Sequence, residues 1–421
     1  MRLSTRAVAS AAVLAMGAGG GAYYWSSQPG PGPAASAPVY AWVQLEAGSG
    51  ASVRAVMPAT AASCPTLTVD GAATAMSKRG PSPSGFSTVF VCEHPLSSPT
   101  KTLAIGALKL PAPTGAANKA LVLGDTGCRA KKGMTPQSCT GDPAQGAWGF
   151  PALSKAAASS SPDFVLHVGD YLYRESCATG CGFNWSTWEA DFFAPAESGG
   201  LLRMAPWVLV RGNHEDCHRA WAGYSLFFAP GPMSAAGCPS SISPYGVTLN
   251  GLTLYLTDTS SDDPQQAQTD FATVKSQIGS SSTAAWLATH VPVCSDDQCN
   301  GGMGLAFQAA GLDKVAAVKW LHVGHVHLFD HTAAGAHHPA QTVSGGGGTA
   351  LDCTSASHCI DSNTKDCIST ACAPPCVAGD TTSCPPHHYT YMTVSTQASS
   401  WDATVYDQSG NDLKIPFSVS R

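Results

Sequence analysis

The chain has 421 residues, only 12% of them charged, and its formal net charge is −6. This length exceeds one average domain and predicts a large domain accompanied by a smaller one. No run of lysine or arginine marks a nucleic-acid-binding stripe or a helix on a membrane surface, so nucleic acid is not expected as a recognition partner. Abundant glycine, alanine and serine favour a compact protein with many loops over a disordered one.

The N-terminal segment is typical of an export signal. Arg2 and Arg6 precede an apolar stretch of small residues from Ala7 to Ala22, and an A-x-A cleavage site follows at Ala35 to Ala37. The stretch is short and broken by glycine, whereas a stable membrane span needs about 20 strongly apolar residues. We therefore expect residues 1–37 to be signal peptide and linker, and the protein to be secreted or periplasmic with no stable span after cleavage. An uncleaved anchor is the alternative.

The sixteen cysteines agree with export, because they would form disulfides in an oxidising compartment. Four pairs are near neighbours in the sequence: Cys128 with Cys139, Cys177 with Cys181, Cys217 with Cys238, and Cys294 with Cys299. Cys64 and Cys92 stand alone in the N-terminal region. Six more lie from Cys353 to Cys384, where a zinc site with ligands from residues 372–388 is the alternative to disulfides.

Residues 38–113 predict a small all-β domain. Short β-type runs are separated there by glycine, proline and serine: Val39 to Leu45, Ser52 to Val56, Thr66 to Val69, Thr88 to Cys92, and Lys101 to Leu108. The proline-rich segment from Pro111 to Gly115 is the expected boundary.

Beyond this boundary, short apolar runs recur and each ends in polar residues: Ala120 to Leu123, Phe164 to Val168, Trp207 to Val210, Leu252 to Leu256, Trp286 to Ala288, and Val318 to Val323. Such runs predict strands buried on both faces, and Asn250-Gly251 predicts a hairpin. Residues 151–159 and 186–193 are candidate helices. The fold class is therefore α/β, in which ligands gather outside the carboxyl ends of strands.

Five separated segments carry candidate metal ligands: Gly124-Asp125, Gly169 to Tyr173, Gly212 to Glu215, His290, and Gly324 to His327. They supply two carboxylates, one phenol, one amide oxygen and three imidazoles, which is enough to hold two metal ions. His325 and His327 alternate, so an extended segment would turn both rings to the same side. Hard oxygen ligands with imidazoles suit iron, zinc or manganese. Polar turn residues are the alternative interpretation.

This order of motifs resembles the calcineurin-like metallophosphoesterases and, within them, the purple acid phosphatases. The resemblance covers Leu121 to His327. It implies a β-sandwich flanked by helices (αββα) in residues 114–421, with a cysteine-rich insertion at about 352–388. The small all-β domain before it would be fibronectin III-like.

The resemblance also implies a role for each ligand. One ion is bound by Asp125, Asp170, Tyr173 and His327, and Asp170 bridges to a second ion held also by Asn213, His290 and His325. His214 lies beside the phosphate as proton donor or hydrogen-bond partner. Arg174 and His218 are candidate substrate-binding residues, with structural pairing or local hydrogen bonding as the alternatives.

Tyr173 distinguishes the purple acid phosphatase type. Many relatives carry Asp-x-His in the first motif, but Asp125 is followed by Thr126 and Gly127, and the phenol of Tyr173 takes the missing ligand's place. A phenolate is a hard anion that favours Fe3+, which would stand beside a divalent Fe2+, Zn2+ or Mn2+. Packing of Tyr173 in the core is the alternative.

We therefore expect an acid phosphatase that hydrolyses the monoester of a small phosphorylated substrate by attack of a metal-bound hydroxide on phosphorus. A trivalent ion lowers the pKa of bound water further than a divalent one does, which predicts an acidic optimum. A phosphodiesterase or nucleotidase with the same metal centre is the alternative. A non-catalytic, disulfide-rich surface binding protein is a more distant one. The sequence indicates neither the physiological substrate nor the oligomeric state.

Overall fold

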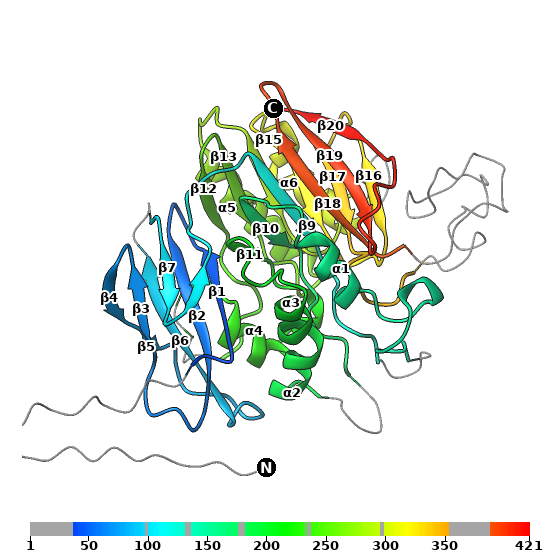
Figure 1. Ribbon diagram of the computed structural model, residues 1–421. Coiled ribbons are helices and arrows are strands. Elements are labelled where there is room, and N and C mark those ends of the chain that lie inside the picture. The colour runs from blue at the N-terminus through cyan, green and yellow to red at the C-terminus, as the bar shows by residue number, and fades with distance from the viewer. Residues whose placement is uncertain are drawn as a thin grey trace, which may run out of the picture. The chain divides into compact units, whose positions relative to one another are not determined.

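The computed structural model describes residues 37–96, 100–130, 136–175, 182–231, 233, 237–294, 299–352 and 388–421 (Figure 1). The expected signal segment lies outside these residues, except for Ala37. So do Cys177, Cys181, the six cysteines from 353 to 384, and nearly all of the segment considered as a zinc site.

The described strands form three sheets. The ten-stranded sheet has the order β20 (Phe417–Ser420), β19 (Ser400–Asp407), β18 (Thr390–Thr396), β9 (Lys119–Leu123), β10 (Phe164–His167), β11 (Trp207–Leu209), β1 (Tyr40–Leu45), β2 (Ala51–Pro58), β6 (Val89–Leu96) and β5 (Ser77–Lys78). The six-stranded sheet has the order β12 (Tyr245–Leu249), β13 (Leu252–Leu256), β14 (Ala285–Ala288), β15 (Val318–Val323), β17 (Ala340–Ser344) and β16 (Phe329–Thr332). The four-stranded sheet has the order β4 (Ala72–Ala75), β3 (Thr66–Val69), β7 (Leu103–Ile105) and β8 (Leu108–Leu110).

Six α-helices of the described residues complete the fold: α1 (Phe150–Ala157), α2 (Trp185–Trp188), α3 (Ala194–Ser198), α4 (Trp221–Phe227), α5 (Pro264–Ile278) and α6 (Gly302–Ala310). Four further helical segments are also present: η1 (Pro143–Gln145), η2 (Glu189–Phe193), η3 (Asn213–Glu215) and η4 (Leu312–Lys314). The two helices expected from the sequence correspond to α1 and to α2 with η2. The longest helix, α5, had not been expected.

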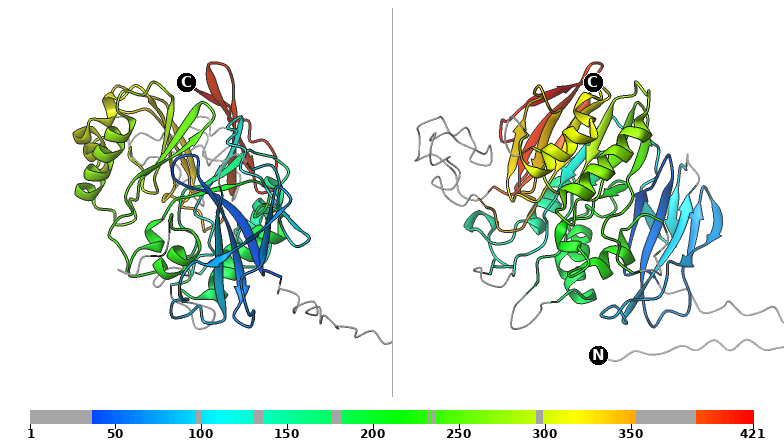
Figure 2. Two further views of the ribbon diagram at one scale, coloured as in Figure 1. Left: turned by 90° about the vertical axis from the view of Figure 1, so that its left-hand side faces the viewer. Right: turned by 180° about the vertical axis from the view of Figure 1, so that it is seen from behind.

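Successive residues of the central strands face different apolar layers. Val122 of β9 packs between the two large sheets, whereas its neighbour Leu121 faces the layer under α1 to α4. In the six-stranded sheet, Trp286 points toward the ten-stranded sheet and Leu287 points toward α5 and α6. Figure 2 shows α5 and α6 over the outer face of that sheet. The layer order is therefore helix, sheet, sheet, helix, and the expected α/β class is confirmed.

The five strand runs predicted in the N-terminal region are present, but β4 and β5 were not predicted and one predicted run is divided. Gly106, at φ 59°, makes a turn that divides the run from Lys101 to Leu108 into two strands, β7 and β8. A fibronectin III-like domain is not confirmed, because β1 pairs in parallel with β11 through Gln44 and Trp207 and so joins the ten-stranded sheet. The domain division near residue 113 stays a prediction.

Four disulfides join described residues: Cys64–Cys92, Cys128–Cys139, Cys217–Cys238 and Cys294–Cys299. The last three confirm pairs expected from the sequence, and disulfides form chiefly in oxidising compartments. As for membrane spans, the part of the chain that the structure describes contains no helix with the length and apolar character that crossing a bilayer requires.

Parallel pairing brings the candidate ligands together. Strands β9, β10 and β11 are parallel neighbours, and so are β14 and β15. Asp125, Asp170 and Asn213 follow the first three strands, and His290 and His325 follow the other two. All five side chains therefore leave the carboxyl ends of strands, where α/β folds place their ligands.

Candidate metal centre

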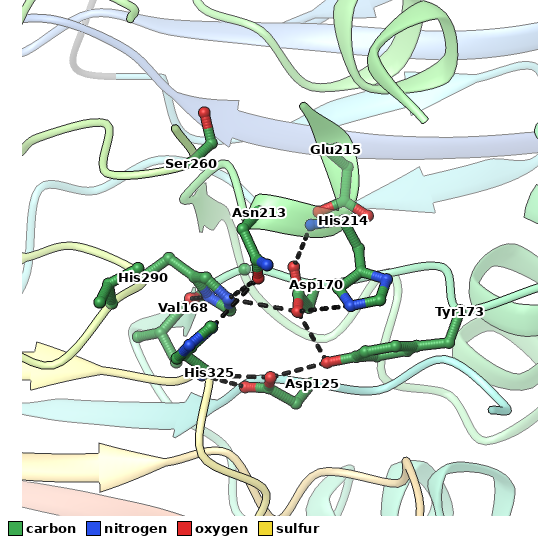
Figure 3. A network of polar contacts seen from close by, with 12 residues as sticks. Asp125, Val168, Asp170, Tyr173, Asn213, His214, Glu215, Ser260, His290 and His325 are labelled. Carbon is green, nitrogen blue, oxygen red and sulfur yellow. Dashed lines mark hydrogen bonds and ion pairs between the residues drawn. The ribbon is translucent and has the colours of Figure 1, made fainter. Parts of the chain in front are cut away.

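The phenol of Tyr173 contacts both carboxylates of the site (Figure 3). Its hydroxyl donates to Oδ1 of Asp125 at 2.7 Å and lies 2.8 Å from Oδ2 of Asp170. The same oxygen is 3.2 Å from Nε2 of His327, and the Tyr173 side chain is fully buried. The four residues expected to bind the first ion are therefore gathered around one point, with the phenolic oxygen among their ligand atoms.

The backbone explains why no histidine stands in the first motif. A Cβ atom on Gly127 would lie 2.6 Å from the carbonyl oxygen of Tyr171 and 3.0 Å from Cα of Leu172. These are rigid backbone atoms, so no side chain fits at this position. The loop that carries Tyr173 thus occupies the space that an Asp-x-His histidine would need.

Asn213, His290 and His325 form the second group of ligands. Oδ1 of Asn213 lies 3.0 Å from Nε2 of His290 and 3.1 Å from Nδ1 of His325. Nε2 of His290 is also 3.2 Å from Oδ2 of Asp170, the carboxylate expected to bridge two ions. All seven expected ligands therefore converge, and Asp125, Asp170 and His290 hold ligand atoms within 4.8 Å of one another.

The hydrogen bonding of His290 tests whether a cation fits. Its Nδ1 lies 2.8 Å from the carbonyl oxygen of Val168, which must accept a proton from that nitrogen. In neutral His290, Nε2 then carries a lone pair and faces two acceptors, Asn213 Oδ1 and Asp170 Oδ2. With the Asn213 amide in this orientation, a cation or a second proton on the ring satisfies the arrangement, and the donor set suits a metal ion.

The pKa values of the site residues also indicate that the site favours a positive charge. Burial alone would lower the pKa of His290, but the adjacent Asp170 carboxylate outweighs it and raises this pKa to about 9. Burial raises the pKa of Asp125 to about 7, with Asp170 adding to the rise. Burial also raises the pKa of the Tyr173 phenol well above its ordinary value, as do Asp125 and Asp170. A bound cation would favour the anionic forms of these oxygen ligands.

Three ligands adopt the left-handed backbone conformation. Asp125 and Asp170 both have φ 57°, and His325 has φ 71°. Non-glycine residues rarely adopt this conformation, and such strain gathers at functional sites. The prediction that an extended segment carries His325 and His327 is wrong, because the chain bends at His325. That bend lets the backbone N–H of His325 donate to both carboxylate oxygens of Asp125 at 3.1 Å.

His214 points into the site and is held from the far side by a residue that the sequence did not single out. Its Nε2 lies 4.0 Å from Oδ2 of Asp170, and its Nδ1 lies 2.7 Å from Oε1 of Glu175. The Arg219 guanidinium lies 3.5 Å from the same Glu175 oxygen. His214 is 5% exposed, so its ring is largely shielded from bulk solvent.

His327 also has a carboxylate behind it. Its backbone N–H donates to Oδ2 of Asp352 at 2.9 Å, and its Nδ1 lies 3.1 Å from the carbonyl oxygen of Ala350 and 3.5 Å from Oδ1 of Asp352. Such partners fix the ring and leave Nε2 for a metal. No sequence motif marks Glu175 or Asp352, because each contacts its histidine only once the loops have folded.

The two candidate substrate-binding residues are less closely tied to the site. Arg174 pairs with buried Asp191, with Nη2 2.7 Å from Oδ1 and Nε 2.9 Å from the same oxygen. This contact supports the structural pairing considered for Arg174. His218 is exposed, and its backbone N–H donates to Asp216. Their role in substrate binding stays a prediction.

A two-sheet α/β fold with carboxylate, amide and imidazole ligands at its strand ends defines a class of metal-dependent hydrolases. Residues 119–328 match the calcineurin-like phosphoesterase family. These residues, just under half of the chain, are therefore similar to the calcineurin-like metallophosphoesterases, a family that uses a two-metal centre.

No curated protein matches the chain. Similar solved structures include GAP50, the anchor in the inner membrane complex of Plasmodium, with 13% identity, a TM-score of 0.46 and coverage of 72% of this chain and 88% of that one. A dimetal phosphatase from Danio rerio has 11% identity, a TM-score of 0.38 and coverage of 72% and 99%. Vacuolar protein sorting 29 from Cryptosporidium parvum has 12% identity, a TM-score of 0.33 and coverage of 72% and 98%. These likenesses are remote, so no activity is transferred from them.

Proposed function

We propose that this protein is an exported acid phosphatase of the purple acid phosphatase type that hydrolyses phosphate monoesters of small molecules. Fe3+ would be held by Asp125, Asp170, Tyr173 and His327, and a divalent Fe2+, Zn2+ or Mn2+ by Asp170, Asn213, His290 and His325. The observation that carries the proposal is the Tyr173 oxygen, which lies within 2.8 Å of both carboxylates.

The summed charge of the ligands supports a pair of ions with different charges, one trivalent and one divalent. Two carboxylates and a phenolate give three negative charges among the ligands, one more than a site with histidine in place of the phenol. A trivalent ion beside a divalent one offsets that additional charge. The bound ions would polarise the phosphate and lower the pKa of the attacking water.

The residues of the chain have separate tasks in this proposal. Asn213, His290 and Asp170 would hold the ions in place, and the ions would in turn position the phosphate. His214, beside Asp170 and 2.7 Å from Glu175, is placed to give a proton to the leaving oxygen. Burial of His214 limits exchange of that proton with bulk water.

Metal analysis with a visible spectrum tests the iron assignment. We expect one iron per chain and a tyrosinate charge-transfer band in the purified protein. A colourless, iron-free protein with full activity would refute the assignment of Fe3+ beside Tyr173. Export is tested separately, by N-terminal sequencing of protein recovered outside the cytoplasm, which should begin near Pro38.

Substrate comparison tests the reaction. Hydrolysis of an aryl phosphate, a bis-aryl phosphate and a nucleotide is measured at several pH values with the same metal-loaded preparation. We expect the aryl monoester to give the highest kcat/KM, with an acidic optimum. A higher value for the bis-aryl ester or the nucleotide would instead identify a phosphodiesterase or a nucleotidase. Absence of turnover with both metals bound would favour a binding protein.

A further inference from the structure

A second group of potential metal ligands lies at the Cys294–Cys299 disulfide. Each sulfur and one ring nitrogen of His338 lie within 4.8 Å of one another, and all three residues are buried. Among the residues that the structure describes, the only other such triplet of ligand atoms is Asp125, Asp170 and His290. The disulfide therefore differs from a simple loop closure, because an imidazole stands beside it.

Cys294 is held in place by hydrogen bonds that do not involve its sulfur. The side-chain oxygen of Gln341, on β17, accepts hydrogen bonds from the backbone N–H groups of Val293 and Cys294, both at 2.9 Å. The amide nitrogen of Gln341 donates to the carbonyl oxygen of Cys294 at 2.6 Å. Breaking the disulfide would leave all three bonds intact.

Cys299 and His338 are anchored in the same way. The carbonyl oxygen of Cys299 accepts a hydrogen bond from Gln308 at 3.1 Å, and a Cβ atom on Gly304 would lie 2.1 Å from that oxygen, so α6 packs directly against this residue. The carbonyl oxygen of His338 accepts from the N–H of Gly335 at 3.0 Å, and His338 is only 4% exposed. The three ligand residues thus keep their backbone positions whatever the oxidation state of sulfur.

We propose that reduction of the Cys294–Cys299 disulfide creates a zinc site made of two thiolates and the His338 imidazole. A dithiol supplies two electrons and two protons: its own sulfurs become a disulfide, the Cys294–Cys299 bond breaks, and each cysteine becomes a thiol. Zn2+ then displaces one proton from each thiol to solvent. Two thiolates and an imidazole are ligands that zinc prefers, and a water completes a four-coordinate site.

The space needed for this change is small. Zinc binds sulfur at about 2.3 Å in a tetrahedral arrangement, so the two sulfurs need to separate to about 3.8 Å. Rotation about the Cα–Cβ bonds achieves this while the backbone stays in place. A cavity of about 430 Å³ has His338 among its lining residues, together with His331, Lys319 and Asp313.

This inference does not depend on the proposed function, since it concerns thiolate ligands outside the catalytic site. The experiment treats the whole protein with dithiothreitol under native conditions, removes the dithiol, and adds iodoacetamide with or without Zn2+. Peptide mass spectrometry then measures alkylation at each cysteine. We expect Zn2+ to slow alkylation of Cys294 and Cys299 but not of Cys217 and Cys238, whose disulfide belongs to no comparable triplet of ligand atoms among the described residues.

The His338→Ala variant separates a zinc site from simple burial, because it retains both cysteines. We expect it to need at least about tenfold more Zn2+ for the same protection. Unchanged protection in His338→Ala, equal protection of all four cysteines, or failure of the dithiol to release Cys294 and Cys299 would each overturn the proposal. Cobalt provides a second readout: its thiolate charge-transfer bands should appear in the reduced protein and be absent from reduced Cys294→Ser/Cys299→Ser.

Discussion

The hydroxyl of Tyr173 donates a hydrogen bond to Asp125 at 2.7 Å, and this contact joins two loops that are 48 residues apart in the sequence. In the proposed function, this phenol takes the ligand position that an Asp-x-His histidine would fill, and its anionic form would set the charge of one metal site.

Tyr173→Phe should abolish the visible charge-transfer band and lower kcat/KM by at least about a hundredfold, because one anionic ligand of Fe3+ is lost. Tyr171→Phe is the matched control. Its hydroxyl donates to the carbonyl oxygen of Val210 at 3.0 Å and touches no ligand. That variant should keep its colour and lose about 1 kcal/mol of stability. Full colour in Tyr173→Phe would show that another group supplies the band.

Gly127→His should not restore activity to Tyr173→Phe, even though it completes an Asp-x-His motif. The new Cβ would lie 2.6 Å from the carbonyl oxygen of Tyr171, so we expect a loss of about 3 kcal/mol or more in urea unfolding. Gly71→Ala is the comparison variant, because it introduces backbone strain without a steric clash. Gly71 has φ 86°, and a Cβ added there would meet nothing within 4 Å, so this variant should lose only about 1–2 kcal/mol. Recovery of activity in the double variant would contradict the steric argument.

His214→Asn should lower kcat by about 10²–10⁴-fold for an alkyl phosphate, whose leaving oxygen needs a proton. The loss should be much smaller for nitrophenyl phosphate, because a nitrophenolate leaves without protonation. Steady-state kinetics with both esters measure the difference. Equal losses for the two substrates would mean that His214 binds phosphate instead of acting as the acid.

Glu175→Gln tests whether this carboxylate positions His214, since the two side chains lie 2.7 Å apart. We expect kcat to fall about tenfold or more, with the same dependence on the leaving group as in His214→Asn and little change in KM. Glu189→Gln is the control, because Glu189 pairs with Tyr40 and not with the site. An unchanged leaving-group dependence in Glu175→Gln would leave Glu175 with a purely structural role.

His322 should reduce stability in acid. It is fully buried between Trp286 and Trp320, with ring centroids 4.5 and 4.6 Å away, and no hydrogen-bond partner for either ring nitrogen lies among the described residues. Burial lowers its pKa to about 3. The unfolded chain, with a pKa of about 6.5, binds the proton first as pH falls, so stability is full above that pH and decreases toward pH 3.

The measurement compares urea unfolding of wild type and His322→Phe at pH 7 and pH 4. We expect His322 to lower the free energy of unfolding of wild type by about 1.4 kcal/mol for each pH unit below 6.5. The His322→Phe variant should lack this contribution. His337→Gln, at an exposed position, should follow wild type. The prediction fails if wild type and His322→Phe lose equal stability between the two pH values.

Local pattern was sufficient for the central strands and for the positions of the candidate ligands. Apolar runs at β9, β10, β11, β14 and β15 were expected because a strand buried on both faces must be continuously apolar. Asp125 and Asp170 were recognisable since each follows glycine at a strand end, where the tight backbone turn is encoded locally. Helix α5, although not expected, also has a local signal: Asp263 caps its first turn and Pro264 occupies the first helical position.

Other features had no local signal. The parallel pairing of β1 with β11 depends on hydrogen bonds between segments more than 160 residues apart, as at Gln44 and Trp207. The bend at His325 brings its backbone N–H to Asp125, a contact 200 residues away in the sequence that extended-strand periodicity cannot anticipate. Structural pairing of Arg174 was one of two open alternatives, and only the tertiary structure could show Asp191 as its partner.

The sequence by itself determined which atoms are available: seven candidate ligands, their order along the chain, and a tyrosine among them, because these are properties of residue type and spacing. The tertiary structure decided which of those atoms meet. It placed the Tyr171 carbonyl against Gly127, Glu175 behind His214, and His338 beside the Cys294–Cys299 disulfide. Contacts between distant loops depend on how two sheets pack, and no short stretch of sequence contains that information.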